Sequence, residues 1–261
     1  MIKKVLTLGL IIVIIRVIDN HYQLNEKRSG RYVLKPELVR EVEMPQLMRD
    51  VEIEQYVRCS GCYYRICSGS HTESWRQLTQ FSVDQVIRSY QSMPEEARTP
   101  AFIMDCVDEV WTNDIDRFDS LHHYRQVKRI STKYLMQFLQ NHSHKNAVSL
   151  YAESMSVHVE ELELELSIMF HLIEKKDDSF LLRKYFVTDE PDVIQAYFHM
   201  STVFSYLAFD HIPDRIEAVS LLNGKSYTFT PDFSKIQASL DYLNLLIGSM
   251  REGYGVRHIY H

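Results

Sequence analysis

Glycine and proline are scarce in this chain, with only 8 and 7 among its 261 residues. These numbers exclude a collagen-like or low-complexity protein, and they leave few places for glycine-rich loops that cradle phosphates. The sequence also lacks a Walker loop, a dinucleotide-binding glycine pattern, a G-x-S-x-G elbow and an H-E-x-x-H zinc motif. Enzymes that carry these local signatures are therefore excluded, whereas a site assembled from distant residues is not.

Positive charge is also in deficit, because 29 Lys and Arg residues face 35 Asp and Glu residues and the net charge is −6. A generally cationic nucleic-acid coat is therefore excluded. The charge is uneven: residues 1–145 contain 20 basic and 18 acidic side chains, whereas residues 146–261 contain 9 and 17. We therefore expect any contact with nucleic acid in the first half of the chain.

The N-terminus carries a long apolar run. Residues 2–18 begin with two lysines and continue almost without a polar side chain until Asp19. About 18 helical residues span about 27 Å, against about 30 Å for the hydrocarbon core of a bilayer, and no small-x-small cleavage site follows. We interpret residues 1–19 as a membrane anchor helix of signal-anchor type. A buried strand or helix and a cleaved signal peptide are the alternatives.

The flanking charges leave the orientation of this anchor open, because lysines precede it and arginines and a lysine end or follow it. The predicted localisation is a membrane-associated, single-pass protein whose side is undetermined, or otherwise a cytoplasmic one.

Three of the four cysteines lie close together with one histidine. Their spacing is C-x2-C-x4-C-x3-H, formed by Cys59, Cys62, Cys67 and His71. Tetrahedral zinc takes four thiolate or imidazole ligands, and Gly61 allows the tight turn that lets the first two sulfurs face one ion. The spacing resembles a compact zinc knuckle in which the third and fourth ligands are exchanged and the last arm is shorter. We predict that these four residues bind Zn²⁺. Disulfides that also involve Cys106, or free buried thiols, are the alternatives.

The resemblance to a zinc knuckle implies recognition of single-stranded nucleic acid through stacking on aromatic side chains. Tyr63 and Tyr64 beside Arg65 would supply the rings and a positive charge. A basic stripe at helical spacing would add phosphate contacts; it consists of Arg125, Lys128, Arg129 and Lys133. The alternative for the stripe is the solvated face of an amphipathic helix.

Residues 20–145 are predicted to form a Cys/His segment and a helical region. Residues 50–58 alternate between polar and apolar positions, which predicts a strand leading into the cysteine turn. Three helices are expected to follow, with a capping box at Ser82, a Thr-Pro start at Thr99 and helical apolar spacing after Asp119. Their predicted ranges are 82–93, 99–111 and 119–140.

Residues 146–261 are predicted to form a second module of alternating hairpins and helices. Period-two alternation over residues 162–173 indicates a long antiparallel strand, and a polar turn joins it to residues 180–187. An apolar helix over 189–209 follows, then a hairpin around Asn223 and Gly224, then a helix from Ser234. This order predicts the α+β class, with an antiparallel sheet made of two hairpins and helices packed on one face.

The histidines give no catalytic cluster that stands out locally. Adjacent His122 and His123 point about 100° apart on a helix, and the pair at 142 and 144 lies in a predicted linker. We therefore interpret the chain as a non-enzymatic binding or assembly protein, tethered to a membrane, whose sheet face and strand edges bind a protein partner. The alternatives are a zinc-knuckle-like binder of single-stranded nucleic acid and a hydrolase-like enzyme with a noncontiguous His/Asp site. The sequence leaves the oligomeric state open.

Overall fold

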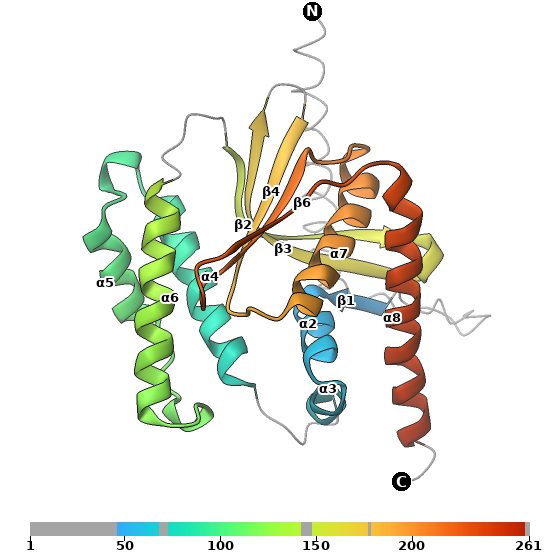
Figure 1. Ribbon diagram of the computed structural model, residues 1–261, viewed down its shortest axis with the longest axis horizontal. Coiled ribbons are helices and arrows are strands. Elements are labelled where there is room, and N and C mark those ends of the chain that lie inside the picture. The colour runs from blue at the N-terminus through green and yellow to red at the C-terminus, as the bar shows by residue number, and fades with distance from the viewer. Residues whose placement is uncertain (1–45, 68–72, 142–147, 177–178, 259–261) are drawn as a thin grey trace, which may run out of the picture.

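The computed structural model describes residues 46–67, 73–141, 148–176 and 179–258 (Figure 1). Within these residues the chain is an α/β protein, with seven α-helices and a mixed six-stranded sheet. The strands are β1 (Gln46–Arg49), β2 (Val148–Val159), β3 (Leu164–Lys176), β4 (Ser179–Phe186), β5 (Arg215–Ser220) and β6 (Ser226–Phe229). The helices are α2 (Asp50–Arg58), α3 (Ser60–Cys67), α4 (Trp75–Ser92), α5 (Pro100–Val110), α6 (Leu121–Asn141), α7 (Pro191–Phe209) and α8 (Ser234–His258).

The sheet divides at β3. One edge of β3 pairs with β2 along almost its whole length, so β1 and β4 must share the other edge. Strand β1 runs parallel to residues 164–167 of β3, whereas β4 runs antiparallel to residues 172–176. Residues 168–171 lie between these two pairings. Beyond them β4 leaves β3 and continues beside β5, with which it is parallel. We call the opening between β1, β3 and β4 the sheet fork.

Helices cover both faces of β4 and β5. Leu182 and Phe186 of β4 pack in one apolar cluster with α2, α7 and α8, whereas Tyr185 and Val187 pack in a second cluster with α4, α5 and α6. The two helical groups lie on opposite sides of the sheet in Figure 1. The sequence-based prediction of an antiparallel sheet with helices on one face is therefore wrong. Alternation of apolar and polar residues predicts the strands, but it does not show whether solvent or helices cover the second face of the sheet.

Several predicted elements are confirmed. The long strand and its return correspond to β3 and β4, and the apolar helix corresponds to α7. Thr99 caps α5, because its hydroxyl accepts a hydrogen bond from the Phe102 amide. The final hairpin is present as β5 and β6, but its loop closes between Ser220 and Lys225, which is longer than the two-residue turn that Asn-Gly predicts.

Residues 50–58 form helix α2, so the predicted strand there is wrong. The Glu52 carboxylate accepts a hydrogen bond from the Arg49 backbone amide and thereby caps the first turn. Asp50, Ile53 and Glu54 are all buried, at the i, i+3 and i+4 spacing of one helix face. The short stretch fits both the period of two of a strand and the period of about 3.6 of a helix. Burial of this helix face favours the helix. Helix α4 also begins earlier than predicted, at a Ser74 cap.

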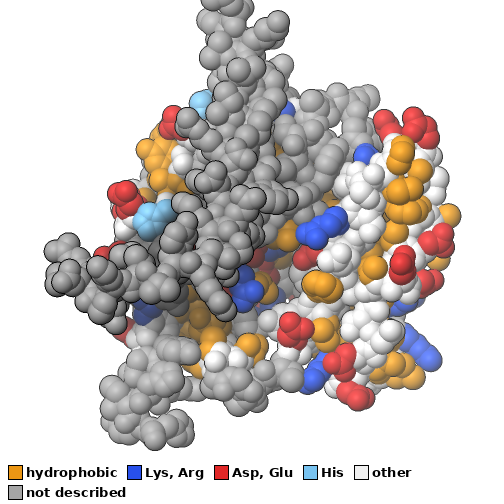
Figure 2. Space-filling model, turned by 180° about the vertical axis from the view of Figure 1, so that it is seen from behind, with side chains coloured by type: hydrophobic (Ala, Val, Ile, Leu, Met, Phe, Trp, Pro, Cys, Tyr) orange, Lys and Arg blue, Asp and Glu red, His pale blue; other side chains and the backbone are white. Residues whose placement is uncertain are grey.

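The remaining predictions about organisation concern the first residues and the division of the chain. The predicted anchor, residues 1–19, lies outside the described residues. None of the described helices has the length and apolar character to cross a membrane. The division at residue 145 stays a prediction; β1 and α2 precede it and contact β3 and α7, which follow it. Charged and hydrophobic side chains intermingle on the described surface of the back face (Figure 2).

The Gly224→Ala substitution tests the packing of the β5–β6 loop on α6. Gly224 has a φ of 72°, and a Cβ there would overlap the Tyr134 ring. We expect a loss of about 1–3 kcal/mol in the free energy of unfolding, measured by urea denaturation, because the substitution combines overpacking with a left-handed backbone.

The matched control is Gly248→Ala in α8, where nothing lies within 4 Å of the added methyl group. This control is expected to stabilise the protein by up to about 1 kcal/mol, because alanine favours a helix over glycine. Equal effects of the two substitutions would contradict the packing that we describe.

Candidate functional site

The candidate site lies in the sheet fork, where α2 begins. Strand β1 leaves β3 after Arg49, and the next residue, Asp50, starts α2. The Asp50 Oδ2 atom accepts a hydrogen bond of 2.9 Å from the backbone amide of Met169. Because Met169 lies between the segments of β3 that pair with β1 and β4, its amide has no strand partner on this edge. A carboxylate therefore takes the place of a strand carbonyl.

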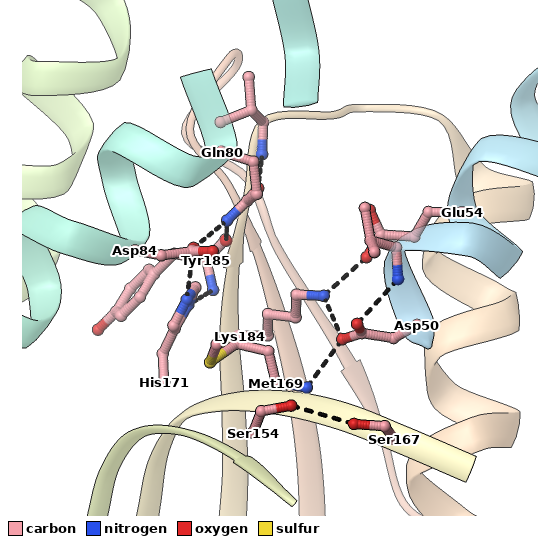
Figure 3. A network of polar contacts seen from close by, with 12 residues as sticks. Asp50, Glu54, Gln80, Asp84, Ser154, Ser167, Met169, His171, Lys184 and Tyr185 are labelled. Atoms are coloured by element: carbon pink, nitrogen blue, oxygen red, sulfur yellow. Dashed lines mark hydrogen bonds and ion pairs between the residues drawn. The ribbon is translucent and has the colours of Figure 1, made fainter. Parts of the chain in front are cut away.

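A buried lysine faces this carboxylate across the fork. Lys184 lies on β4 and is only 3% exposed. Its ammonium nitrogen lies 2.7 Å from Asp50 Oδ2 and 2.7 Å from Glu54 Oε1 (Figure 3). Asp50 and Glu54 are four residues apart on α2, so both carboxylates are on the same helix face. We call Lys184, Asp50 and Glu54 the charge triad.

Burial and ion pairing act in opposite directions on the charge triad. Burial lowers the pKa of Lys184, but the adjacent Asp50 and Glu54 carboxylates reverse this effect and raise the pKa above its ordinary value. Burial raises the pKa of Glu54, and the Lys184 charge offsets only part of that rise. Lys184 therefore stays protonated at neutral pH, and Glu54 has a stronger tendency than an exposed glutamate to take up a proton.

Helix α4 provides the other wall of the fork. The Gln80 side chain pairs with the free edge of β4: its amide nitrogen donates to the Tyr185 carbonyl and its oxygen accepts from the Val187 amide. The same nitrogen also donates to Asp84 Oδ1 at 2.7 Å. His171 Nδ1 accepts from the Tyr185 amide, so its Nε2 carries the proton and donates to Asp84 at 2.9 Å.

Both ring nitrogens of His171 are thus occupied, and the side chain is fully buried. A general base needs a free nitrogen that the substrate can reach. His171 therefore positions Asp84 and holds the end of β4, rather than accepting a proton from a substrate.

A pocket of about 460 Å³ opens over these groups. The charge triad and Asp84 lie in its wall together with Ser154 and Met169. Seven charged side chains line it, of which five are acidic: Arg49, Asp50, Glu52, Glu54, Glu73, Asp84 and Lys184. The pocket thus combines hard oxygen ligands with one buried ammonium group, and its overall charge is negative.

The structure places the predicted zinc ligands differently from a knuckle. Cys59 and Cys62 are joined in a disulfide across the junction of α2 and α3. The disulfide alternative is thus met in part, because Cys106 is a free, buried thiol. Cys67 is free and exposed, and His71 lies outside the described residues. Among the residues that the structure describes, no group of three or more His, Cys, Asp or Glu side chains is placed to hold a metal ion by itself. Zinc binding by the four residues stays a prediction.

The predicted nucleic-acid residues are in two separate places. Tyr63 and Tyr64 are buried and pack edge to face with each other and with Tyr56, and the Tyr64 hydroxyl donates to backbone carbonyls of α8. Arg65 lies beside them and contacts the Cys62 sulfur. These rings are packing groups in this conformation. The basic stripe, Arg125, Lys128, Arg129 and Lys133, lies on α6 along a groove with α5.

The charge triad is not among the sequence-based predictions, although the sequence contains one signal for it. Arg183 and Lys184 interrupt an otherwise apolar strand whose residues from Phe180 to Phe186 are all buried. Buried lysine and arginine are rare unless they are paired. Two consecutive charges point to opposite faces of a strand, so at least one of them had to meet a buried carboxylate.

Comparisons with known proteins give likenesses of structure but none of sequence family. No family model matches the chain, and no curated protein matches it. Among solved structures, a putative exonuclease from Eubacterium rectale matches with a TM-score of 0.43 and 12% identity, over 84% of this chain and 88% of that chain. We draw no functional argument from a likeness of this degree.

The Lys184→Met substitution tests whether the two carboxylates depend on the ammonium group. It leaves Asp50 and Glu54 buried without a cation, and we expect a loss of about 3–5 kcal/mol in unfolding free energy at pH 8. Loss of the lysine raises the folded-state pKa of Glu54 further above its unfolded value. The destabilisation should therefore shrink as the pH falls through this folded-state pKa towards the unfolded value. Urea denaturation at pH 8 and pH 5 measures it.

The control for this experiment is Lys235→Met, which removes a surface lysine paired with Asp232. Exposed ion pairs contribute little, so the change should stay within about 0.5 kcal/mol. If Lys184→Met lowers the unfolding free energy equally at both pH values, unpaired ionised carboxylates are not the cause of the destabilisation.

Proposed function

We propose that the pocket over the sheet fork, which we call the fork pocket, is the active site of a hydrolase. This hydrolase would cleave phosphodiester bonds of nucleic acids with a divalent metal ion. The observation that carries this proposal is the charge triad, with Lys184 held between Asp50 and Glu54 beside the pocket. This function develops the third of the sequence-based interpretations, a hydrolase whose residues are far apart in the chain. The residues of the site differ from the histidine clusters considered there.

The first support comes from the energetics of burial. Moving three charged groups out of water costs several kcal/mol for each, and apolar residues of similar volume often give equal or greater stability. A charge triad beside an accessible pocket is therefore poorly explained by stability alone. Perturbed titratable groups that converge in a pocket are typical of catalytic sites.

The second support is the fit of the pocket to a divalent cation. Mg²⁺ takes oxygen ligands, and proteins commonly hold it through one or two carboxylates together with substrate phosphates. Asp50 would supply such a carboxylate at the pocket wall, which leaves Glu54 free to act as a base. Because acidic side chains outnumber basic ones in the pocket wall, a phosphate group needs an added cation to enter. A bound divalent ion would lower the pKa of a water molecule and neutralise charge on the phosphate.

The residues of the site then have distinct roles. Lys184 stays protonated and stabilises the negative charge that develops on the phosphoryl oxygens. Glu54, whose pKa burial raises, accepts the proton of the attacking water molecule. The water oxygen bonds to phosphorus as the bond from phosphorus to the leaving oxygen breaks, and solvent protonates that oxygen. Asp84 is fixed by Gln80 and His171 at the side of the pocket.

An exposed aromatic ring supports nucleic acid as the class of substrate. Helix α4 presents Gln77, Gln80, Phe81 and Asp84 to the pocket, at one-face spacing. Val83, Val86, Ile87 and Tyr90 of α4 pack in the core, whereas Phe81 is 63% exposed. A base next to the scissile phosphate would stack on this ring, as unpaired bases do on aromatic side chains.

Substitutions in the charge triad test the proposed activity. We expect Glu54→Gln and Asp50→Asn to lower the rate of hydrolysis of labelled single-stranded and double-stranded oligonucleotides at least about 100-fold. The assay contains Mg²⁺ or Mn²⁺, and EDTA should abolish the activity of the parent protein. Glu96→Gln, an exposed position in the short helix Glu95–Ala97, is the matched control and should retain full activity.

No metal-dependent cleavage of any oligonucleotide by the folded parent protein would refute this proposal. Activity that persists in a folded Glu54→Gln and Asp50→Asn double variant would refute the assignment of the site. Circular dichroism and thermal melting identify variants that are not folded.

Phe81→Ala tests the stacking contact separately from the chemistry. Loss of one base-stacking contact should raise the KM for a single-stranded oligonucleotide about 5- to 100-fold and change kcat less. Phe233→Ala is the control, since Phe233 is 73% exposed and does not line the pocket. Equal KM values for the two variants would exclude stacking on Phe81.

A further inference from the structure

A second concave surface lies away from the fork, between α5 and α6. This groove has a volume of about 590 Å³, and α5 and α6 form the outer layer of their side of the molecule in Figure 1. Four apolar side chains line it: Met104, Val107, Ile130 and Met136. Met104 is 51% exposed although it is a large hydrophobic residue. We call this surface the α5–α6 groove.

The rim of the groove is strongly cationic. Arg125, Lys128, Arg129 and Lys133 line it, with Asp108 as the single acidic residue. Lys128 is neutralised by Asp108, at 2.9 Å. Within the described part of the chain, no carboxylate lies at ion-pair distance from Arg125, Arg129 or Lys133. Helix α6 contains no acidic residue, so these three exposed cations form a row of uncompensated positive charge along it.

We infer that the α5–α6 groove binds an acidic amphipathic helix of a partner protein. The apolar floor fits the hydrophobic face of such a helix, and the two methionines can adjust to its side chains. The cationic rim complements acidic side chains that flank that face. A third helix placed against α5 and α6 would extend their packing, over about 16 Å along the 11 residues of α5.

The lining favours a protein helix over a nucleic-acid strand. A strand binds through its phosphates and through aromatic rings that stack on its bases. The groove has cations, but none of its lining residues is aromatic. Methionine and isoleucine on the floor would add nothing to phosphate binding. The inference is therefore independent of the proposed hydrolase activity, which uses the fork pocket.

Fluorescence anisotropy of the full-length protein with model peptides tests this inference. The probe is a labelled 18-residue helix with leucine on one face and glutamate on the other. We expect micromolar binding, and about tenfold or greater weakening for Arg129→Glu and for the double variant Met104→Ser and Met136→Ser. Lys235→Glu, on α8, is the matched control for the change of charge and should bind as the parent does.

Two further probes separate the possible occupants. A leucine/lysine peptide should bind at least about tenfold more weakly to the parent protein and regain affinity for Arg129→Glu. Binding of an 18-residue oligothymidine, which the fork pocket would account for, should depend neither on Arg129 nor on the methionines. The inference is overturned if the acidic peptide does not bind, if the methionine variant binds it unchanged, or if oligothymidine binds as tightly and Arg129→Glu weakens it equally. Thermal melting confirms that each variant is folded.

Discussion

The ion pairs of Lys184 with Asp50 and Glu54 join strand β4 to helix α2 at the point where the sheet divides. Lys184 belongs to β4, which leaves β3, and the carboxylates belong to α2, which begins where β1 leaves β3. Two strands on one edge of β3 would otherwise meet end to end. The charge triad fills the interval between them, and Asp50 also accepts the Met169 amide there. The same side chains thus close the sheet locally and form the wall of the pocket.

The polar character of the fork follows from its backbone. Where β4 leaves β3, amides and carbonyls lose their strand partners, and buried backbone groups without partners are costly. His171 accepts the Tyr185 amide, and the Gln80 amide group bonds on both sides of Phe186, to the Tyr185 carbonyl and the Val187 amide. A divided sheet in a covered core therefore requires polar side chains at the division, and some of them remain accessible from the pocket. Fold and candidate site have the same physical origin.

The sequence predicts individual elements better than their pairing. Alternation of apolar and polar residues predicts β3 and the returning strand β4, and the cap at Thr99 predicts α5. These signals lie within a few neighbouring residues. The parallel pairings of β1 with β3 and of β4 with β5 join segments more than 30 residues apart, and no local pattern encodes them. Residues 50–58 are short enough to fit both periodicities. A strand would place Asp50 and Glu54 about 13 Å apart on its polar face, whereas the helix places them one turn apart on a buried face. The strand prediction therefore does not bring the two carboxylates together around one lysine.

The uneven charge along the chain takes on a different meaning in the folded protein. The more basic first half contributes Asp50, Glu54 and Asp84 to an acidic pocket, and the acidic second half contributes the lysine that they surround. The cations of the first half gather instead on α6, at the other surface. A pocket dominated by carboxylates needs a cation before it can accept a phosphate, whereas a groove rimmed by arginine attracts carboxylates directly. Opposite electrostatics on two concave surfaces thus separate the proposed reaction from the proposed partner contact.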